Sequence, residues 1–155
     1  METKSNHVRL EWIRVKLGYI GKLVVDSVGM KGGLCLFWDD SIDVNMISYS
    51  KFHIDAQVVA EKGASWRFTG MYGQLKSSQR IHSWIFLHRL HGMSTLLWVC
   101  AGDFNEILDD SEKKGGSQHR SSMMDAFRCA LDDCGLQDLG FSGPEFTWSN
   151  KREGL

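Results

Sequence analysis

The sequence predicts an α/β fold in which strands form a mixed-sheet sandwich and helices lie beside it. Three observations predict this class. Segments with alternating apolar and polar residues fill the middle of the chain, segments with helical spacing stand before, between and after them, and one wholly apolar run has the length of a buried strand. The chain of 155 residues, 43% hydrophobic and 24% charged, has the size and composition of one globular domain.

The first predicted element is an amphipathic helix over residues 5–17. Val8, Trp12 and Val15 recur at helical spacing and form its apolar face. Gly18 follows the last periodic residue and can end the helix, because glycine adopts the left-handed conformation of a helix C-terminus without strain.

Short extended segments follow this helix, at residues 22–26, 34–38, 42–46, 52–60 and 66–72. In the last three, apolar and polar residues alternate, which is the pattern of a half-buried strand. A turn around residues 61–64 joins the last two into a hairpin. The apolar run at residues 96–101 predicts a buried strand, and residues 145–149 form the last strand candidate.

Two more helices are predicted. One covers residues 77–91, and the other begins with a capping-box-like pair, Ser122 and Asp125, and ends at Gly135. The residues expected at helical spacing on their apolar faces are Ile81, Trp84, Ile85 and His88 in the first, and Phe127, Ala130, Leu131 and Cys134 in the second.

Composition excludes several classes of protein. A net charge of −1 argues against a protein that coats nucleic acid by bulk positive charge. No apolar run approaches the roughly 18–20 residues of a membrane span, and the N-terminus has no apolar signal region. The four cysteines form no C-x-x-C pair, which argues against a zinc site. We therefore expect an intracellular protein in a reducing compartment, in the nucleus or the cytoplasm, with no membrane partner and no organic cofactor.

The strongest chemical signal is the segment GDFNE at residues 102–106, directly after the predicted buried strand. Asp103 can orient a water molecule or take its proton, and Asn105 can donate to an oxyanion. Gly102 allows a tight turn and the close approach of a ligand. Because turns also favour Gly, Asp and Asn, the spacing alone leaves a catalytic site and a plain turn open.

Further segments accompany GDFNE in a fixed order along nearly the whole chain. They are METK (1–4), GGLCLFW (32–38), FHIDAQV (52–58), WRFTGMYGQ (66–74), SW (83–84), AGDFNEIL (101–108), EKKGG (112–116), CGLQDLGFSG (134–143) and FTWSN (146–150). This ordered set resembles the endonuclease/exonuclease/phosphatase superfamily, most closely the endonuclease domain of plant non-LTR retrotransposon (LINE-type) polyproteins. The resemblance implies a DNase I-like α/β sandwich.

The resemblance also implies roles for individual residues. Glu2 matches the carboxylate that holds the catalytic Mg²⁺ or Mn²⁺, which prefers hard oxygen ligands. Tyr72 matches the tyrosine that contacts the scissile phosphate. Asp103 matches the residue that orients or deprotonates the attacking water, and Asn105 matches the one that steadies the phosphate. Trp148 resembles an aromatic beside the nucleic-acid groove, although core packing is an equally good interpretation of a tryptophan in a strand.

Other polar residues receive no chemical role. Glu106 belongs to the plant-type form of the GDFNE motif, and we assign it no catalytic step. Leu75 stands where plant-type sequences usually have Pro, a departure that concerns the loop after Tyr72. His82, His88 and His91 are interpreted as surface or core histidines, because no carboxylate or cysteine completes a metal-binding set with them.

Some family motifs do not occur in these 155 residues: W-N-x-R-G of the first strand, and R-L-D and S-D-H of the last two strands. We therefore expect residues 1–155 to be a single, partial domain without those three strands. Catalytic groups that act as a unit lose most of their effect when one is missing, so this chain is expected to be inactive. The intact reaction would be metal-dependent hydrolysis of DNA phosphodiester bonds.

Three alternatives remain open at this stage. The chain could bind nucleic acid or a protein without catalysis, or it could belong to a branch that acts on RNA or small phosphoesters, against which the plant-type GDFNEIL and FTWSN segments argue. It could also be a gene fragment without a stable fold. The sequence does not determine the oligomeric state.

Overall fold

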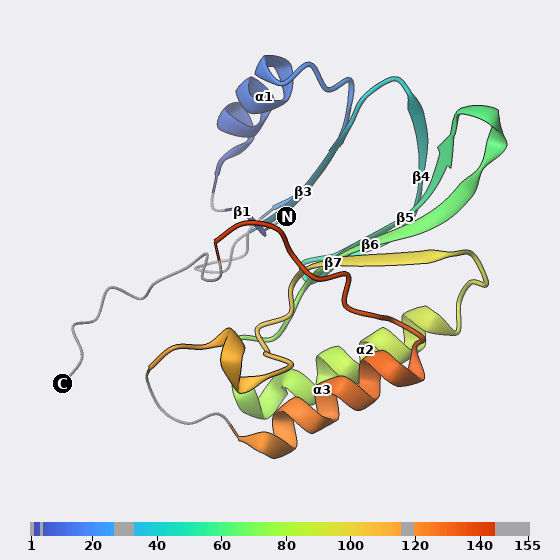
Figure 1. Cartoon of the computed structure of the whole chain (residues 1–155). Coiled ribbons are helices and arrows are strands. Elements are labelled where there is room, and N and C mark those ends of the chain that lie inside the picture. The colour runs from blue at the N-terminus through green and yellow to red at the C-terminus, as the bar shows by residue number, and fades with distance from the viewer. Residues whose placement is uncertain (1, 4, 27–32, 116–119, 145–155) are drawn as a thin grey trace. The chain divides into compact units, whose positions relative to one another are not determined.

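The computed structural model describes residues 2–3, 5–26, 33–115 and 120–144 (Figure 1). They divide into two compact units, one made of the described residues within 1–73 and 94–104 and the other of those within 74–93 and 105–144. The strand candidate at residues 145–149 and Trp148 lie outside the described residues, so they stay predictions.

The first unit contains two β-sheets and one helix. Its elements are β1 (Glu2–Thr3), α1 (His7–Lys16), β2 (Gly21–Val25), β3 (Gly33–Trp38), β4 (Ile42–Ser50), β5 (His53–Ala60), the 3₁₀ turn η1 (Glu61–Gly63), β6 (Ser65–Tyr72) and β7 (Trp98–Asp103). One sheet has the order β1-β3-β2 with antiparallel neighbours. The other has the order β4-β5-β6-β7, in which only β6 and β7 are parallel among the described strands. The mixed sheet accompanied by helices confirms the predicted α/β class.

Apolar side chains from both sheets form one core cluster. Its buried members are Leu34 of β3, Ile54 of β5 and Tyr72 of β6. The partly buried residues packed against them are Leu23, Val25, Leu36, Met46 and Phe52. The alternating residues of β4 and β5 thus place their apolar side chains between the sheets, as the period of two predicts.

Helix α1 forms where the sequence predicts it, but its apolar face is exposed. Asn6 caps the helix by accepting a hydrogen bond from Arg9 N at 2.9 Å, and Gly18 follows it in the left-handed conformation. Val8, Trp12 and Val15 are 79%, 60% and 62% exposed, whereas the buried residue is Leu10. The predicted helix is thus confirmed, but the residues at helical spacing are not the ones it buries.

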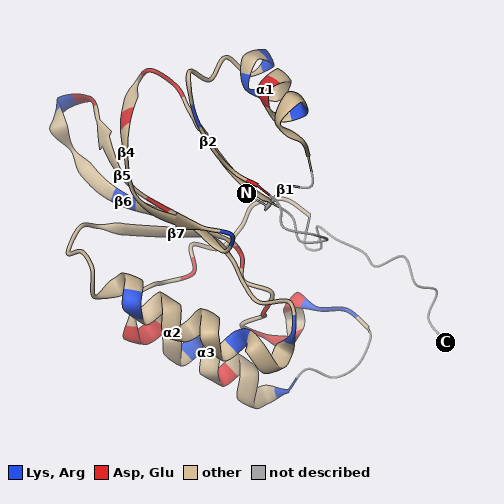
Figure 2. Ribbon diagram, turned by 180° about the vertical axis from the view of Figure 1, so that it is seen from behind, with Lys and Arg blue, Asp and Glu red and all other residues tan. Residues whose placement is uncertain are grey.

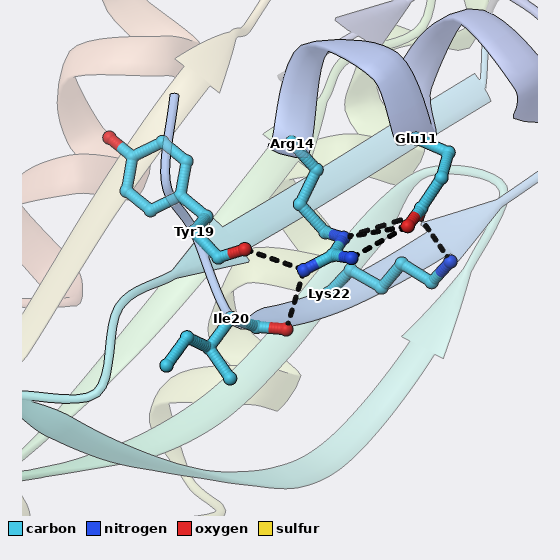
Figure 3. Close-up of polar contacts among 5 residues, drawn as sticks. All are labelled: Glu11, Arg14, Tyr19, Ile20 and Lys22. Carbon is cyan, nitrogen blue, oxygen red and sulfur yellow. Dashed lines mark hydrogen bonds and ion pairs between the residues drawn. The ribbon is translucent and has the colours of Figure 1, made fainter. Parts of the chain in front are cut away.

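A polar network connects α1 to β2 (Figure 3). The guanidinium of Arg14 donates to the backbone oxygens of Tyr19 and Ile20, at 2.6 and 3.0 Å. Glu11 accepts hydrogen bonds from Arg14 and from Lys22 of β2, each with a shortest distance of 2.6 Å. These cations, Arg14 foremost, lower the pKa of Glu11 from 4.5 to about 2. Side-chain to backbone hydrogen bonds therefore hold the end of the helix.

Strand β7 differs from its prediction in burial. The apolar run predicts a buried strand, yet β7 alternates between half-buried and exposed residues at its start and is exposed at its end. Leu97, just before it, is 82% exposed. The reason is topological, because β7 is an edge strand in the part of the chain that the structure describes.

The opposite face of the four-stranded sheet carries a buried polar network. Asp55 of β5 and Arg67 of β6 are 0% and 1% exposed, and two hydrogen bonds of 2.8 Å join their carboxylate and guanidinium. Thr69 donates to Asp55 at 2.7 Å and accepts from the indole nitrogen of Trp98 at 2.8 Å. The guanidinium carbon also lies 5.2 Å from the centre of the Trp98 ring. One network thus spans β5, β6 and β7.

A bulge in β4 extends this polar face. The register between β4 and β5 shifts between Met46 and Ser48, which turns Ser48 and Ser50 to the side of His53. The two hydroxyls lie 2.9 and 2.8 Å from the two ring nitrogens of His53. Burial of the ring lowers the pKa of His53, with Asp55 opposing and Arg67 reinforcing that shift.

The second unit consists of helices. Its elements are the 3₁₀ turn η2 (Ser77–Gln79), α2 (Arg80–His91), the 3₁₀ turn η3 (Asp110–Glu112) and α3 (Ser121–Asp133). Trp84 of α2 and Phe127 of α3 stack with ring centres 4.4 Å apart. The other buried residues of the two helices are Ser83, Leu87, Leu90, Met124 and Ala130, and Cys134 just after α3 is also buried.

The predicted apolar face of α2 was partly wrong. Trp84 is buried, but Ile81 and Ile85 are 47% and 60% exposed. Ile81 and Ile85 lie to one side of Trp84 around the helix, and Leu87 and Leu90 lie to the other side. Packing against α3 buries the second side.

The predicted capping box at the start of α3 was also wrong. The helix begins after Arg120, and no side chain caps it. A capping box occurs instead at η3, where Asp109 accepts from Ser111 N and Glu112 accepts from Asp109 N. Gly135 follows α3 with a φ of 64°, as predicted for its end.

Replacing Asp55 with Asn should destabilise the protein by roughly 3–5 kcal/mol, because it removes the charge that compensates a buried guanidinium. Urea unfolding of the Asp55→Asn variant measures this. Asp43→Asn, on an exposed position of β4, is the matched control and should leave stability nearly unchanged. Equal losses of unfolding free energy in the two variants would contradict the claim that Asp55 stabilises the protein by compensating the buried charge of Arg67.

The Glu11 cluster should give the protein a pH-dependent contribution to stability. Because folding lowers the pKa of Glu11 from 4.5 to about 2, the contribution is complete above pH 4.5 and is lost as the pH falls towards 2. The difference in melting temperature between the parent chain and Glu11→Gln should shrink over that range. An NMR titration in which Glu11 of the folded protein ionises with a midpoint near 4.5 would contradict this pH-dependent contribution to stability.

Candidate functional site

Tyr72 and Asp103 lie side by side at the ends of neighbouring strands. They are register partners in the parallel pair β6–β7, so their side chains emerge on the same face of the sheet. Asp103 is exposed, whereas Tyr72 is only 5% exposed and its ring packs in the core cluster. The sheet therefore brings together two of the predicted site residues, one accessible and one embedded.

Glycines permit a close approach of the two strand ends. Gly73 N donates to Asp103 O at 2.7 Å. A Cβ atom at Gly73 would lie 2.1 Å from Phe104 O, and one at Gly102 would lie 1.9 Å from Met71 O. Gly102, with a φ of 145°, thus serves close approach, as the sequence predicts, but the group that approaches it is the backbone of β6 rather than a ligand.

The strand that carries Glu2 borders the same cluster. Glu2 is the register partner of Leu34, whose side chain belongs to the core cluster with Tyr72. Glu2 therefore belongs to the sheet that packs against the face of β6 on which Tyr72 lies.

The remaining predicted residues are not brought into this group. Asn105 belongs to the second unit, where its backbone has a φ of 56°. Asparagine tolerates this left-handed conformation better than most residues with a Cβ. Trp148 lies outside the described residues.

The available donors suit a hard divalent cation. Mg²⁺ usually takes one or two carboxylates and keeps several waters, so Glu2 and Asp103 are of the right type for such a site. Among the described residues, no three His, Cys, Asp or Glu side chains gather as a metal-binding group.

Sequence reasoning missed the ion pair made by the last residue of the GDFNE segment. The Glu106 side chain is 0% exposed and accepts from Arg80 Nη1 at 2.9 Å. The only available signal was the position of Glu106 directly after Asn105, because Arg80 lies far away in the sequence.

Charges of both signs occur on α1 and α3, whereas α2 has basic residues, Arg80 and Arg89, and no acidic one (Figure 2). On α1 the acidic Glu11 is paired with basic neighbours, and on α3 Arg128 lies 3.1 Å from Asp125. No helix in the described ranges is long and apolar enough to span a lipid bilayer.

Comparison with known proteins gives structural matches. No protein-family model and no curated protein match the chain. The human Nocturnin catalytic domain with bound sulfate anion matches with a TM-score of 0.43 and 13% identity, over 63% of this chain and 46% of that one. D. rerio TDP2 complexed with single-strand DNA product matches with a TM-score of 0.47 and 12% identity, over 88% of this chain and 51% of that one. Both belong to the endonuclease/exonuclease/phosphatase superfamily, and this chain spans about half the length of these structures.

Gly73→Ala should destabilise the first unit by roughly 1–3 kcal/mol, because the new methyl group would collide with the Phe104 carbonyl. Chemical denaturation measures this change. Gly92→Ala is the control, since its φ is −68° and its Cβ would lie 3.8 Å from the nearest atom. A loss no larger in Gly73→Ala than in Gly92→Ala would show that the strand ends can separate freely.

Proposed function

We propose that this chain carries part of an endonuclease/exonuclease/phosphatase-type site whose complete form hydrolyses DNA phosphodiester bonds with a divalent cation. The observation that carries the proposal is the pairing of Tyr72 with Asp103 at the ends of β6 and β7. The ordered sequence motifs supply the chemistry that this pairing would serve.

Each residue would have a distinct task. Asp103, exposed at the end of its strand, would orient a water molecule and take its proton as the water attacks phosphorus. Tyr72 would act only through its hydroxyl, because the ring is buried, and that O–H would donate a hydrogen bond to a scissile-phosphate oxygen. Asn105 would donate its side-chain amide to the phosphate oxygens.

Glu2 would hold the cation, and Asp103 would be a second carboxylate that acts on it through water. When bound, Mg²⁺ or Mn²⁺ would polarise a phosphoryl oxygen and offset the charge of the leaving group. The donor set is thus compatible with phosphodiester hydrolysis.

We further propose that the chain is closest to a plant retrotransposon endonuclease and that these 155 residues alone are inactive. GDFNEIL and FTWSN support the first point, and the lack of R-L-D and S-D-H among the residues supports the second. The groups that orient and contact the phosphate would then be incomplete.

Cation binding tests the site independently of turnover. Titration with Mn²⁺ should broaden the NMR signals of residues around Glu2 and Asp103 selectively, and Glu2→Gln or Asp103→Asn should abolish that broadening. Glu112→Gln, which changes an exposed carboxylate of η3, is the control and should leave it intact. Broadening that is absent, or equal in all variants, would contradict the proposed site.

A nicking assay tests the activity. With Mg²⁺, the purified chain should leave supercoiled DNA intact. Mg²⁺-dependent nicking that Asp103→Ala abolishes would establish the proposed reaction and overturn the proposed inactivity. Faster turnover of RNA or of a phosphomonoester than of DNA would contradict the proposed substrate.

A further inference from the structure

The residue after Asn105 is unusually constrained for a loop position. Glu106 has a completely buried side chain, and one carboxylate oxygen accepts from Arg80 Nη1 at 2.9 Å. The other oxygen accepts from Ile107 N at 3.1 Å. A carboxylate is rarely buried to this extent without such partners, so these contacts hold the segment in place.

Arg80 is itself fixed in the second unit. It is the first residue of α2, its side chain is 14% exposed, and η2 leads directly into it. In the same unit, Ser83 of α2 accepts a hydrogen bond from Gln74 N at 3.1 Å. The ion pair therefore ties the segment at residues 105–107 to the beginning of an anchored helix.

Asn105 needs support of this kind. Its φ of 56° is one of two positive φ values among the described residues other than glycine, the second being that of Lys62 in η1. Such conformations persist where the surrounding structure holds them. Here the next residue, Glu106, accepts a hydrogen bond on each of its two carboxylate oxygens.

We propose that Glu106 and Arg80 are positioning residues that hold Asn105 in its left-handed conformation and so present its amide to a phosphate. The phosphate role rests on the proposed function, whereas the holding of Asn105 does not. Glu106, to which the sequence motifs assign no catalytic step, would thus act by holding Asn105 rather than by contacting the phosphate.

The first measurement concerns conformation. The ¹³Cα and ¹³Cβ chemical shifts of Asn105 report its backbone angles, and in the parent chain they should be those of a left-handed residue. Glu106→Gln keeps the shape of the side chain but removes its charge, and Arg80→Met removes the other partner. Both should shift the Asn105 signals, whereas Arg80→Lys, which keeps the charge, should restore them in part.

Asp125→Asn is the matched control because it breaks an exposed ion pair with Arg128 in the same unit. It should leave the Asn105 signals unchanged. If Glu106→Gln does not fold, Arg80→Lys and Arg80→Met still provide the comparison. Parent-like Asn105 signals in folded Glu106→Gln or Arg80→Met would overturn the proposal.

The second measurement concerns the ligand and uses inorganic phosphate in the presence of Mg²⁺. Phosphate should move the side-chain amide signal of Asn105, with an apparent affinity about tenfold weaker in Glu106→Gln, as when groups that orient a ligand-binding residue are removed. If phosphate leaves the Asn105 amide unchanged in the parent chain while the variants still alter its conformation, the proposed function fails and the positioning role stands. If phosphate binds with equal affinity in parent and variants, the proposal that Glu106 and Arg80 present the Asn105 amide to a phosphate is overturned.

Discussion

The buried ion pair between Asp55 and Arg67 fixes the register on which the candidate site depends. These residues are diagonal neighbours, since Asp55 pairs with Thr69 and Arg67 pairs with Gln57. A slip of one residue between β5 and β6 would turn Arg67 to the opposite face and separate two buried charges. The cost of burying either charge alone makes such alternatives unfavourable.

The same network carries this register to β7. Arg67 is the register partner of Trp98, whose indole donates to Thr69. With Trp98 held there, the residues further along both strands must also pair, and this places Asp103 beside Tyr72. The polar network on one face of the sheet thus sets the register that brings Tyr72 and Asp103 together on the opposite face, at the ends of β6 and β7.

A buried carboxylate paired with arginine recurs in the second unit. Glu106 and Arg80 connect the segment of Asn105 to α2, as Asp55 and Arg67 connect two strands. In both places the desolvation cost of the two charges offsets much of their attraction, so the pair adds little to the free energy of folding. Its larger effect is to disfavour backbone arrangements in which the two charges are separated. Structure around the predicted site residues is therefore specified by charged side chains that contribute no chemistry.

The sequence by itself determined where the secondary structure forms and which class of fold results. Alternation identified β4, β5 and β6, and turn residues identified the ends of α1 and α3, because these signals act between residues close in the chain. It also singled out Asp103, Tyr72 and Glu2 through motifs. Only the tertiary structure decided that Val8, Trp12 and Val15 are exposed, that β7 lies at a sheet edge, and that Arg80 reaches Glu106. Those outcomes depend on which distant elements pack together, and apolar periodicity is equally compatible with a face that meets a partner and one that meets solvent.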